Sequence, residues 1–349
     1  MTPTAPISVA LVGFGMAGRT FHAPLISSTP GLALRWVVSQ QGAAARTAFP
    51  SARVTPWLRE VLDDANTELV VIATPTAMHA EQARAVLEAG KHVVVDKPFA
   101  TSVAEAERVL QVAERVGRMA ITFQNRRFDS DYLTLRALVQ GGVLGEVTHL
   151  DSHFDRYRPV VRDRWREQAG PGSGVWLDLG AHLVDQAVHL LGAPLAISAD
   201  LMRQRAGAVT DDAFLAILRY PSHRVIVRAS SLAAAHALRF VAHGTLGSFE
   251  KRGLDVQEAA LAAGQHPGAY EWGVDPSPGT LTVPVGDAMR TREVRSIPGD
   301  YRRFYELVRD AVQGGAPPPV TPSEILTVMR VLDAGVESST TRREITLPT

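Results

Sequence analysis

The fold is decided by one stretch near the start of the chain, Ile7-Ser8-Val9-Ala10-Leu11-Val12-Gly13-Phe14-Gly15-Met16-Ala17-Gly18. In it, an apolar strand leads directly into the pattern Gly-x-Gly-x-x-Gly. Gly13 allows a tight turn, Gly15 lets the backbone approach a pyrophosphate at the N-terminus of the next helix, and Gly18 lets that helix pack close to the strand. A second strand pattern, Leu32 to Val38, follows about one βαβ unit later. This context favours a dinucleotide-binding turn over a glycine-rich turn that only connects two elements.

The composition is that of an ordinary globular protein. Of the 349 residues, 46% are hydrophobic and 21% are charged, a balance that can bury a core, and the length favours two domains. Lys plus Arg equals Asp plus Glu at 36 each, so charge gives no argument for nucleic acid or for an anionic membrane surface. No apolar run approaches the ~20 residues that span a bilayer, and no signal for secretion is visible. We therefore expect a cytoplasmic protein with neither nucleic acid nor membrane as a partner.

The chain contains no cysteine, which excludes disulfides, Cys-ligated metal centres and thiol nucleophiles. It also lacks a His-Glu-x-x-His motif and any tight cluster of histidines and carboxylates along the sequence. We therefore expect no metal site.

The first 124 residues alternate strand and helix patterns at the spacing of an α/β domain. The expected strands are short, rich in Val, Ile and Leu, and do not alternate, as in a parallel sheet buried on both faces. Two helices are expected, and the second opens with the capping box Ser102-x-x-Glu105 and ends at Gly117. Residues 1–124 are thus predicted to form a Rossmann dinucleotide-binding domain. The strands are expected at Ser8–Val12, Leu32–Val38, Leu69–Ala73, His92–Val95 and Met119–Thr122, and the helices at Met78–Ala89 and Ser102–Val116.

Residues 125–349 show a different pattern, that of an α+β domain for substrate binding and oligomerisation. Alternating segments predict a mostly antiparallel open sheet with one covered face. Residues 264–300 are rich in Gly and Pro and are expected to form long loops, and the last helix is expected to pack back on the first domain. The strands are expected at Val147–Arg156, Ala196–Gln204, Phe214–Tyr220, Arg224–Ser231 and Leu238–His243, and the helices at Ser130–Gln140, Val175–Leu191, Tyr301–Gln313 and Pro322–Thr341.

Asp96-Lys97-Pro98 directly follows a buried strand. A lysine just past the C-terminal end of a parallel strand points into the crevice where open α/β sheets bind ligands. The alternative is a surface lysine in a turn, and position alone does not separate the two.

Asp178 and His182 are four residues apart in an expected helix and so share a face. The carboxylate can orient or charge-stabilise the imidazole, and histidine is the side chain best suited to exchange a proton near neutral pH. The alternative is that positions 178, 182, 185 and 189 form the solvated stripe of an amphipathic helix.

These motifs together resemble the Gfo/Idh/MocA oxidoreductases, the family of glucose–fructose oxidoreductase and myo-inositol dehydrogenase, over nearly the whole chain. The family's Glu-Lys-Pro appears as Asp96-Lys97-Pro98, a conservative departure, and its Asp-x-x-x-His pair appears as Asp178 and His182. The resemblance is closer still to the bacterial subgroup with NADP-dependent scyllo-inositol dehydrogenases. The segments that carry it are Phe21-His22-Ala23-Pro24, Asn125-Arg126-Arg127-Phe128-Asp129-Ser130-Asp131, His153-Phe154-Asp155-Arg156 and Arg162-Asp163-Arg164-Trp165-Arg166-Glu167.

The resemblance implies an NAD(P)-dependent dehydrogenase acting on a secondary alcohol of a cyclitol or sugar. His182 would be the general base in the oxidation direction, Lys97 would bind the reacting oxygen, and Asp178 would orient and polarise the pair. His22 and Arg19 are expected to be structural or near the phosphates. The implied substrate residues are Lys97, Arg126, Asp155, Tyr157, Trp165, Asp178 and His182, and the implied cofactor residues are Gly13, Phe14, Gly15, Met16, Ala17, Gly18, Ser39, Gln40, Arg46, Thr74, Pro75, His79, Asp96, Lys97 and Asn125.

The end of the second strand bears on the choice between NADP and NAD. Sites for NAD usually place an acid there, which accepts from the ribose 2′-hydroxyl and repels a 2′-phosphate. Here the strand ends in Val38-Ser39-Gln40-Gln41, and no acid follows until Glu60. Ser39 and Gln40 can bind a phosphate, with Arg46 in reach, so we expect NADP. The subgroup often has a basic residue where Gln40 stands, which keeps NAD open.

Two other functions fit the same fold: glycoside hydrolysis with tightly bound NAD, known in one branch of the family, and a non-catalytic sugar-responsive regulator. The missing acid after the second strand argues against permanently bound NAD. A retained set of Lys97, Asp178 and His182 argues against a pure binder. The resemblance also implies a homodimer or homotetramer formed through the exposed sheet face of the second domain.

Overall fold

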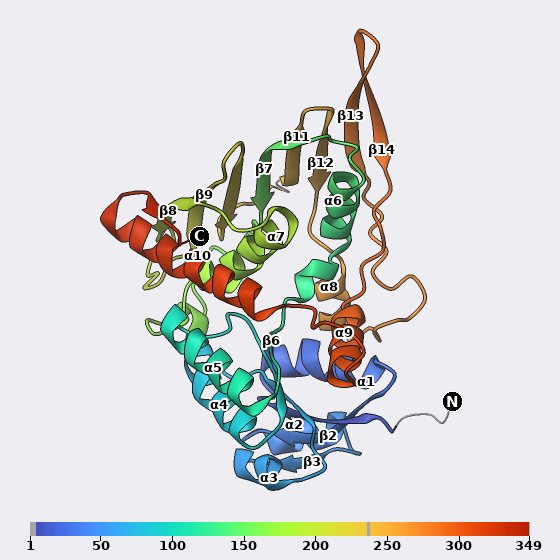
Figure 1. The fold of residues 1–349 in the computed structure, drawn as a ribbon, viewed down its shortest axis with the longest axis vertical. Helices are drawn as coiled ribbons and strands as arrows, with labels where there is room; N and C mark the ends of the chain where they lie inside the picture. The colour runs from blue at the N-terminus through green and yellow to red at the C-terminus, as the bar shows by residue number, and fades with distance from the viewer. Residues whose placement is uncertain (1–4, 236–237, 349) are drawn as a thin grey trace. The chain divides into compact units, whose positions relative to one another are not determined.

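The computed structural model describes residues 5–235 and 238–348 (Figure 1). Within them the chain forms two compact units. Unit 1 holds the chain up to Asn125 together with Gln257–Trp272 and Asp300–Leu326, and unit 2 holds the remainder. Two segments from the second half of the sequence therefore belong to the first unit.

Unit 1 is built on a six-stranded sheet with the order β3-β2-β1-β4-β5-β6, in which all neighbouring strands are parallel. Every residue of β4 is buried, as expected for a strand covered on both faces. β3 was not predicted from the sequence, since its three residues include an exposed arginine and offer no apolar run. The strands are β1 (Ile7–Val12), β2 (Leu32–Val38), β3 (Arg53–Thr55), β4 (Leu69–Ile72), β5 (His92–Val95) and β6 (Ala120–Thr122).

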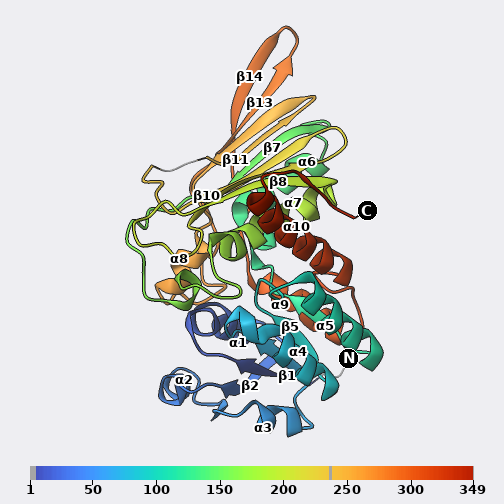
Figure 2. The ribbon, with the colours of Figure 1, turned by 90° about the vertical axis from the view of Figure 1, so that its left-hand side faces the viewer.

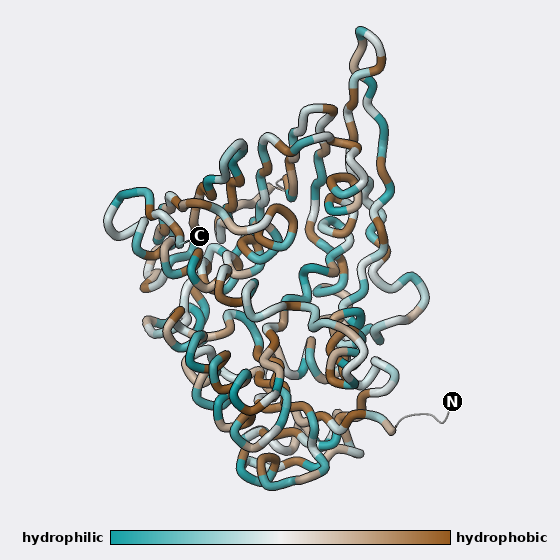
Figure 3. Tube along the Cα trace, in the orientation of Figure 1, coloured by the Kyte–Doolittle hydropathy of each residue, from teal (hydrophilic) through white to brown (hydrophobic). Residues whose placement is uncertain are grey.

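Helices α4 and α5 each bury one face, and both alternate polar and apolar residues along their turns (Figure 3). The predicted cap of α5 is present: the Ser102 hydroxyl accepts from the Glu105 N–H, and Gly117 is left-handed at φ 63°. The Glu105 carboxylate reaches back to the Thr101 N–H, one residue before the cap. The helices are η1 (Gly18–His22), α1 (Ala23–Ser28), α2 (Gly42–Ala48), α3 (Leu58–Asp63), η2 (Thr76–Met78), α4 (His79–Glu88), α5 (Val103–Val116), α8 (Gln257–Ala262) and α9 (Arg302–Val312).

Unit 2 contains a nine-stranded sheet with the order β14-β13-β12-β11-β7-β10-β9-β8-β15. Among the described strand pairs, β10–β7 is parallel and the others are antiparallel, as the sequence predicts. The strands are β7 (Val147–His153), β8 (Ala196–Met202), β9 (Ala213–Arg219), β10 (Arg224–Ser230), β11 (Leu238–Gly244), β12 (Gly247–Arg252), β13 (Gly279–Val285), β14 (Ala288–Val294) and β15 (Ile345–Thr346).

The expectation of long loops at residues 264–300 is wrong for β13 and β14. They form a hairpin that extends beyond the neighbouring strands (Figure 1). Gly286, with φ 62°, and Asp287 make a two-residue turn between Val285 and Ala288. The Gly and Pro content of the segment hid the period-2 alternation of Thr280-Leu281-Thr282-Val283.

Helices cover one face of this sheet. Figure 2 shows α6 (Ser130–Gln140), α7 (Ala181–Leu191) and α10 (Pro322–Thr341) on the same side of the strands. On the opposite face, Leu215 and Ile217 of β9 are 43% and 39% exposed, while the residues that alternate with them, Phe214, Ala216 and Leu218, are buried. The sheet therefore has one covered and one open face. None of the described helices is long and apolar enough to cross a membrane.

Trp176 anchors the helices to the sheet in unit 2. Its side chain is fully buried, its indole N–H donates to the Leu332 carbonyl at 2.9 Å, and its ring packs edge-on against Phe214 at 4.9 Å. A Cβ at Gly180 or Gly335 would collide with the indole. The two glycines therefore let α7 and α10 close around this ring.

Candidate active site

The glycine turn has the geometry that the sequence predicts. Gly13 has φ 98°, and a Cβ there would lie 2.6 Å from the Ala73 carbonyl oxygen. A Cβ at Gly18 would strike the Gly13 carbonyl, so the helix must approach the turn this closely. At Gly15, no atom of the described residues lies within 4 Å of the Cβ position. The turn is thus closed by packing at its two ends and open at Gly15, which fits a pyrophosphate at the start of the helix.

The helix after the turn contains a π-helical segment, η1, before α1. Phe14 is buried and packs edge-on against Phe49, whereas Met16 is 52% exposed. Of the turn residues that the sequence assigns to the cofactor, Met16 therefore borders solvent and Phe14 belongs to the core.

The end of β2 carries polar groups and no carboxylate. The Ser39 hydroxyl accepts from the Gln41 N–H at 2.9 Å, and Gln40 is exposed. Arg46 lies on α2 with a guanidinium nitrogen 3.0 Å from where a Cβ of Gly42 would stand, beside this turn. The carboxylate of Glu60, the first acid in sequence, accepts from the Thr55 hydroxyl. These donors fit a ribose 2′-phosphate.

His79 ties the ends of β4 and β5 together. It is buried, with Nδ1 2.9 Å from the Pro98 carbonyl oxygen and Nε2 2.9 Å from that of Thr74. The Thr74 hydroxyl donates to Gln82. Thr74, Pro75 and the segment Asp96–Pro98 are thus brought to one edge of the sheet, where the sequence analysis placed the cofactor.

Lys97 lies directly after β5 and is half-buried. The Asp96 carboxylate, 5% exposed, accepts from the Lys97 N–H at 2.8 Å, and the Lys97–Pro98 peptide bond is cis. Asn125, also assigned to the cofactor, is buried where unit 1 ends. The position of Lys97 at the carboxyl edge of a parallel sheet is that of a ligand-binding residue.

His22 lies next to Asp96 and is fully buried. Its Nδ1 is 2.6 Å from the Tyr305 hydroxyl, and its Nε2 is 3.9 Å from Asp96 Oδ1. Burial lowers the pKa of His22 to about 4, although the charge of Asp96 opposes this. His22 is therefore neutral at pH 7, which fits the structural role that the sequence analysis gave it.

This buried histidine predicts a loss of stability in acid. Below the ordinary pKa of 6.5, His22 in the unfolded chain binds a proton, whereas His22 in the folded chain does not bind one until about pH 4. The free energy of unfolding therefore decreases as the pH is lowered from 6.5 to about 4. The expected loss from His22 is about 3 kcal/mol. Urea unfolding at pH 7.0 and 4.5 measures it, and a His22→Asn variant is expected to show a flatter dependence. The same change at exposed His266 is the control, and equal slopes in all three proteins would contradict the assignment.

Asp178 and His182 lie on a continuous helical segment of unit 2. Asp178 is in the π-helical turn η5 (Trp176–Gly180), and His182 is in the first turn of α7. His182 is 5% exposed, and Asp185 is 1% exposed and accepts two bonds from Arg127 at 2.7 and 2.8 Å. A stripe this buried is not the solvated face of an amphipathic helix. π-Helical turns of this kind are frequent at functional sites.

The start of this helical segment is capped from a distant part of the chain. The Asp211 carboxylate accepts from the Trp176 N–H at 2.6 Å, and a Cβ at Gly174 would strike it. Burial raises the pKa of Asp211 to about 6 despite these hydrogen bonds. Gly174 thus leaves the space that the capping carboxylate of Asp211 occupies.

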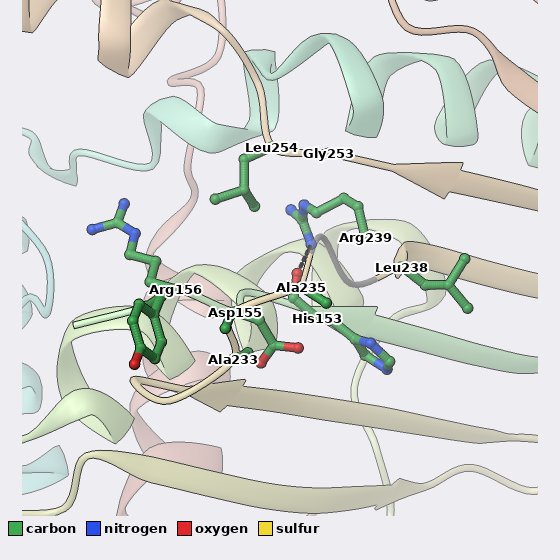
Figure 4. Close-up of a pocket in the computed structure, with 11 residues that line it drawn as sticks. His153, Asp155, Arg156, Ala233, Ala235, Leu238, Arg239, Gly253 and Leu254 are labelled. Atoms are coloured by element: carbon green, nitrogen blue, oxygen red, sulfur yellow. Dashed lines mark hydrogen bonds between the residues drawn. The ribbon is translucent and has the colours of Figure 1, made fainter. Parts of the chain in front are cut away.

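Asp155 and Tyr157 line one cavity of about 290 Å³ in unit 2 (Figure 4). Asp155 Oδ2 accepts from Arg228 at 3.0 Å, while its buried Oδ1 has no hydrogen-bond partner among the described residues. Arg126 does not line this cavity. It is buried, pairs with Asp129 at 3.3 Å and stacks over Phe154.

Lys97 belongs to unit 1, and Asp178 and His182 belong to unit 2. Their joint action therefore stays a prediction. Among the described residues, no group of three or more His, Asp or Glu side chains is arranged to hold a metal ion.

Two family models match this chain. The one described as “Oxidoreductase family, NAD-binding Rossmann fold” matches residues 7–124, and “Oxidoreductase family, C-terminal alpha/beta domain” matches residues 136–347. The chain belongs to the Gfo/Idh/MocA family of oxidoreductases. It is an NAD(P)-dependent oxidoreductase whose Rossmann-type domain and mostly antiparallel second sheet are the expected fold.

Several relatives align with this chain over nearly their whole length. The chain is 45% identical to the uncharacterized oxidoreductase YdgJ of Escherichia coli, covering 98% of this chain and 99% of that protein. It is 36% identical to the scyllo-inositol 2-dehydrogenase (NADP(+)) IolW of Bacillus subtilis, covering 98% and 96%. A crystal structure of an oxidoreductase from Bacillus cereus, 28% identical, superposes with a TM-score of 0.92 over 98% of this chain and 99% of that one.

Sequence reasoning did not give Asp211, Tyr305 or Arg166 a place in this Gfo/Idh/MocA site. Asp211 caps η5, Tyr305 bonds to His22, and Arg166 lies 3.3 Å from Asp178. Arg166 lies in the segment Arg162-Asp163-Arg164-Trp165-Arg166-Glu167, which carries part of the family resemblance and so offered a signal. Asp211 and Tyr305 had none, because their partners are remote in sequence.

Proposed function

We propose that this Gfo/Idh/MocA oxidoreductase transfers a hydride between a secondary alcohol of a cyclitol or sugar, of the scyllo-inositol kind, and NADP. The observation that carries the proposal is the burial of His182 four residues after Asp178. A buried imidazole with a carboxylate on the same helical face is suited to take a proton from a bound hydroxyl.

We assign His182, Asp178 and Lys97 separate roles in the reaction. In the oxidation direction, His182 accepts the hydroxyl proton, and Asp178 orients the ring and stabilises the imidazolium that forms. Lys97 donates a hydrogen bond to the same oxygen and stabilises its developing negative charge. The nicotinamide, when bound, supplies the hydride acceptor.

A polyhydroxylated substrate is supported by Asp155. Asp155 lines the cavity, where its carboxylate can accept a hydrogen bond from a substrate hydroxyl. The cavity beside it also offers Tyr157, which is 60% exposed. Trp165 and Arg126 do not line this cavity, and their role as substrate residues rests on the family resemblance alone. The 36% identity to IolW favours a cyclitol over other alcohols.

NADP is supported by the end of β2. Ser39, Gln40 and Arg46 offer donors there, and the nearest acid in sequence, Glu60, is bound to Thr55. The name of IolW points to the same cofactor.

A Ser39→Asp variant tests the cofactor assignment. The new carboxylate would repel a 2′-phosphate, so kcat/KM with NADP is expected to fall by about 10–100-fold while the value with NAD is retained or rises. Ser39→Ala is the matched control, since it removes the hydroxyl without adding charge. Equal losses with both cofactors would refute the assignment.

The function is tested by absorbance at the reduced-nicotinamide band. Scyllo-inositol, myo-inositol and a panel of aldoses are each offered with NADP and with NAD. Turnover with NADP and a cyclitol is the expected result, and turnover with NAD alone would keep the enzyme and overturn the cofactor. Product formation without net cofactor reduction would favour the glycoside hydrolase, and cofactor binding with no turnover would favour the regulator.

The open sheet face supports a homo-oligomer. Leu215 and Ile217 stand exposed on it, and a second copy of the chain would cover them. Light scattering is expected to give the mass of a dimer or tetramer, and a monomer at micromolar concentration would refute this.

A further inference from the structure

We propose that Arg166 is a positioning residue that holds the Asp178 carboxylate in place for His182. The inference rests on the proposed function, because it assigns a purpose to the arginine within the proton-transferring pair. Arg166 itself would touch neither substrate nor cofactor.

The contact between the two side chains is direct. Arg166 Nε lies 3.3 Å from Asp178 Oδ1, and the side chains are 16% and 20% exposed. The Arg166 guanidinium also stacks over the Trp165 ring, 4.4 Å from its centre. A planar cation fixed by an aromatic face can hold a carboxylate in one orientation better than a mobile surface charge can.

The backbone around Arg166 is tied to the start of the same helical segment. The Gly174 N–H donates to the Arg166 carbonyl at 3.0 Å, and the Ser173 hydroxyl donates to that of Trp165. Gly174 stands two residues before Trp176, the first residue of the helical turn that contains Asp178. The segments that carry Arg166 and Asp178 are thus connected by main-chain hydrogen bonds as well as by the ion pair of their side chains.

A buried ionic network holds this loop in place from its other side. Glu167, 6% exposed, pairs with Arg205 at 3.1 Å and with Arg164 at 2.6 Å. Arg205 in turn pairs with Asp212 at 3.0 Å and donates to the carbonyls of Arg158 and Val160. The loop that presents Arg166 is therefore rigidly anchored to unit 2.

The consequence for the reaction follows from charge and orientation. A cation this close attracts the Asp178 carboxylate and limits its rotation. Only an ionised, correctly turned carboxylate stabilises the imidazolium of His182, and small misplacements of such groups reduce rates strongly. The other acids near this segment are already engaged, Asp185 by Arg127 and Asp211 by the Trp176 N–H.

A double-mutant cycle between Arg166→Gln and Asp178→Asn tests the proposal. Arg166→Gln is expected to lower kcat by about 10–100-fold with little change in the KM for NADP. Arg166→Lys keeps the charge without the planar fork and is expected to recover part of the loss. In the Asp178→Asn background, Arg166→Gln is expected to change kcat by less than about twofold, since its target is gone.

The control is Arg342→Gln, which removes an exposed arginine paired with Asp200. It is expected to leave kcat unchanged. Multiplicative losses in the Arg166→Gln/Asp178→Asn double variant, with no recovery in Arg166→Lys, would show a merely structural role and overturn the proposal.

A second readout separates this proposal from the proposed function. If the wild-type protein turns over no alcohol, the function fails, and the cycle is repeated on urea unfolding midpoints. If the double variant is no less stable than the less stable of the two single variants, Arg166 and Asp178 are coupled in the fold. If the two single shifts of the midpoint add up in the double variant, the two residues are not coupled.

Discussion

A Lys97→Ala variant is expected to lose at least about a thousandfold in kcat with NADP and a cyclitol. Lys97 is the cation proposed to stabilise the oxygen that gains negative charge as the hydride leaves. It stands at the end of β5, where its backbone N–H is held by the buried carboxylate of Asp96. Water in its place would supply neither the charge nor the fixed donor.

Lys97→Met is the matched variant for this experiment, because it keeps most of the apolar stem and removes the charged ammonium group with its hydrogen-bond donors. Cofactor binding, followed by the change in protein fluorescence on adding NADPH, should survive in both variants. If either variant kept more than about a tenth of the wild-type kcat, Lys97 would not be the stabilising group.

Trp176→Ala is expected to lower the free energy of unfolding by about 3–5 kcal/mol. The indole is fully buried against Phe214, and Gly180 and Gly335 leave room for that ring and nothing else. Truncation would leave a cavity and remove the hydrogen bond from the indole to the Leu332 carbonyl. The neighbouring π-helical turn carries Asp178, so kcat should fall as well.

Two other tryptophan variants sharpen this result. Trp57 is 65% exposed, and Trp57→Ala is expected to change stability by no more than about 0.5 kcal/mol. Trp176→Phe keeps most of the ring and should lie between the two alanine variants. Urea unfolding measures all three, and a Trp176→Ala loss as small as that of Trp57→Ala would contradict the packing described.

The sequence predicts most of unit 1 because its signals are local. β2 and β5 begin and end where the apolar runs do, and α5 begins at its Ser102 cap and ends before left-handed Gly117. The β13–β14 hairpin was not predicted, because its strands are exposed on the sheet edge and carry few apolar residues. β3, three residues long, offered too little sequence for a periodic pattern.

In the candidate site, too, only the features that depend on neighbouring residues could be predicted. The glycine turn and the Asp178–His182 spacing are of this kind. The bond from His22 to Tyr305 joins residues 283 positions apart, and Trp176 receives its cap from Asp211, 35 positions later. Such contacts depend on how each unit folds, so no local sequence pattern predicts them. The buried surroundings of His182 likewise became visible only with the packing of unit 2.

Transfer of deuterium from carbon to cofactor tests the central claim most directly. The protein is incubated with NADP and scyllo-inositol carrying deuterium on its ring carbons, and the reduced cofactor is examined by mass spectrometry. The account predicts NADPH heavier by one deuterium, with none transferred by Lys97→Met. Reduced cofactor without deuterium, or a converted substrate with no reduced cofactor, would contradict hydride transfer as the function of this protein.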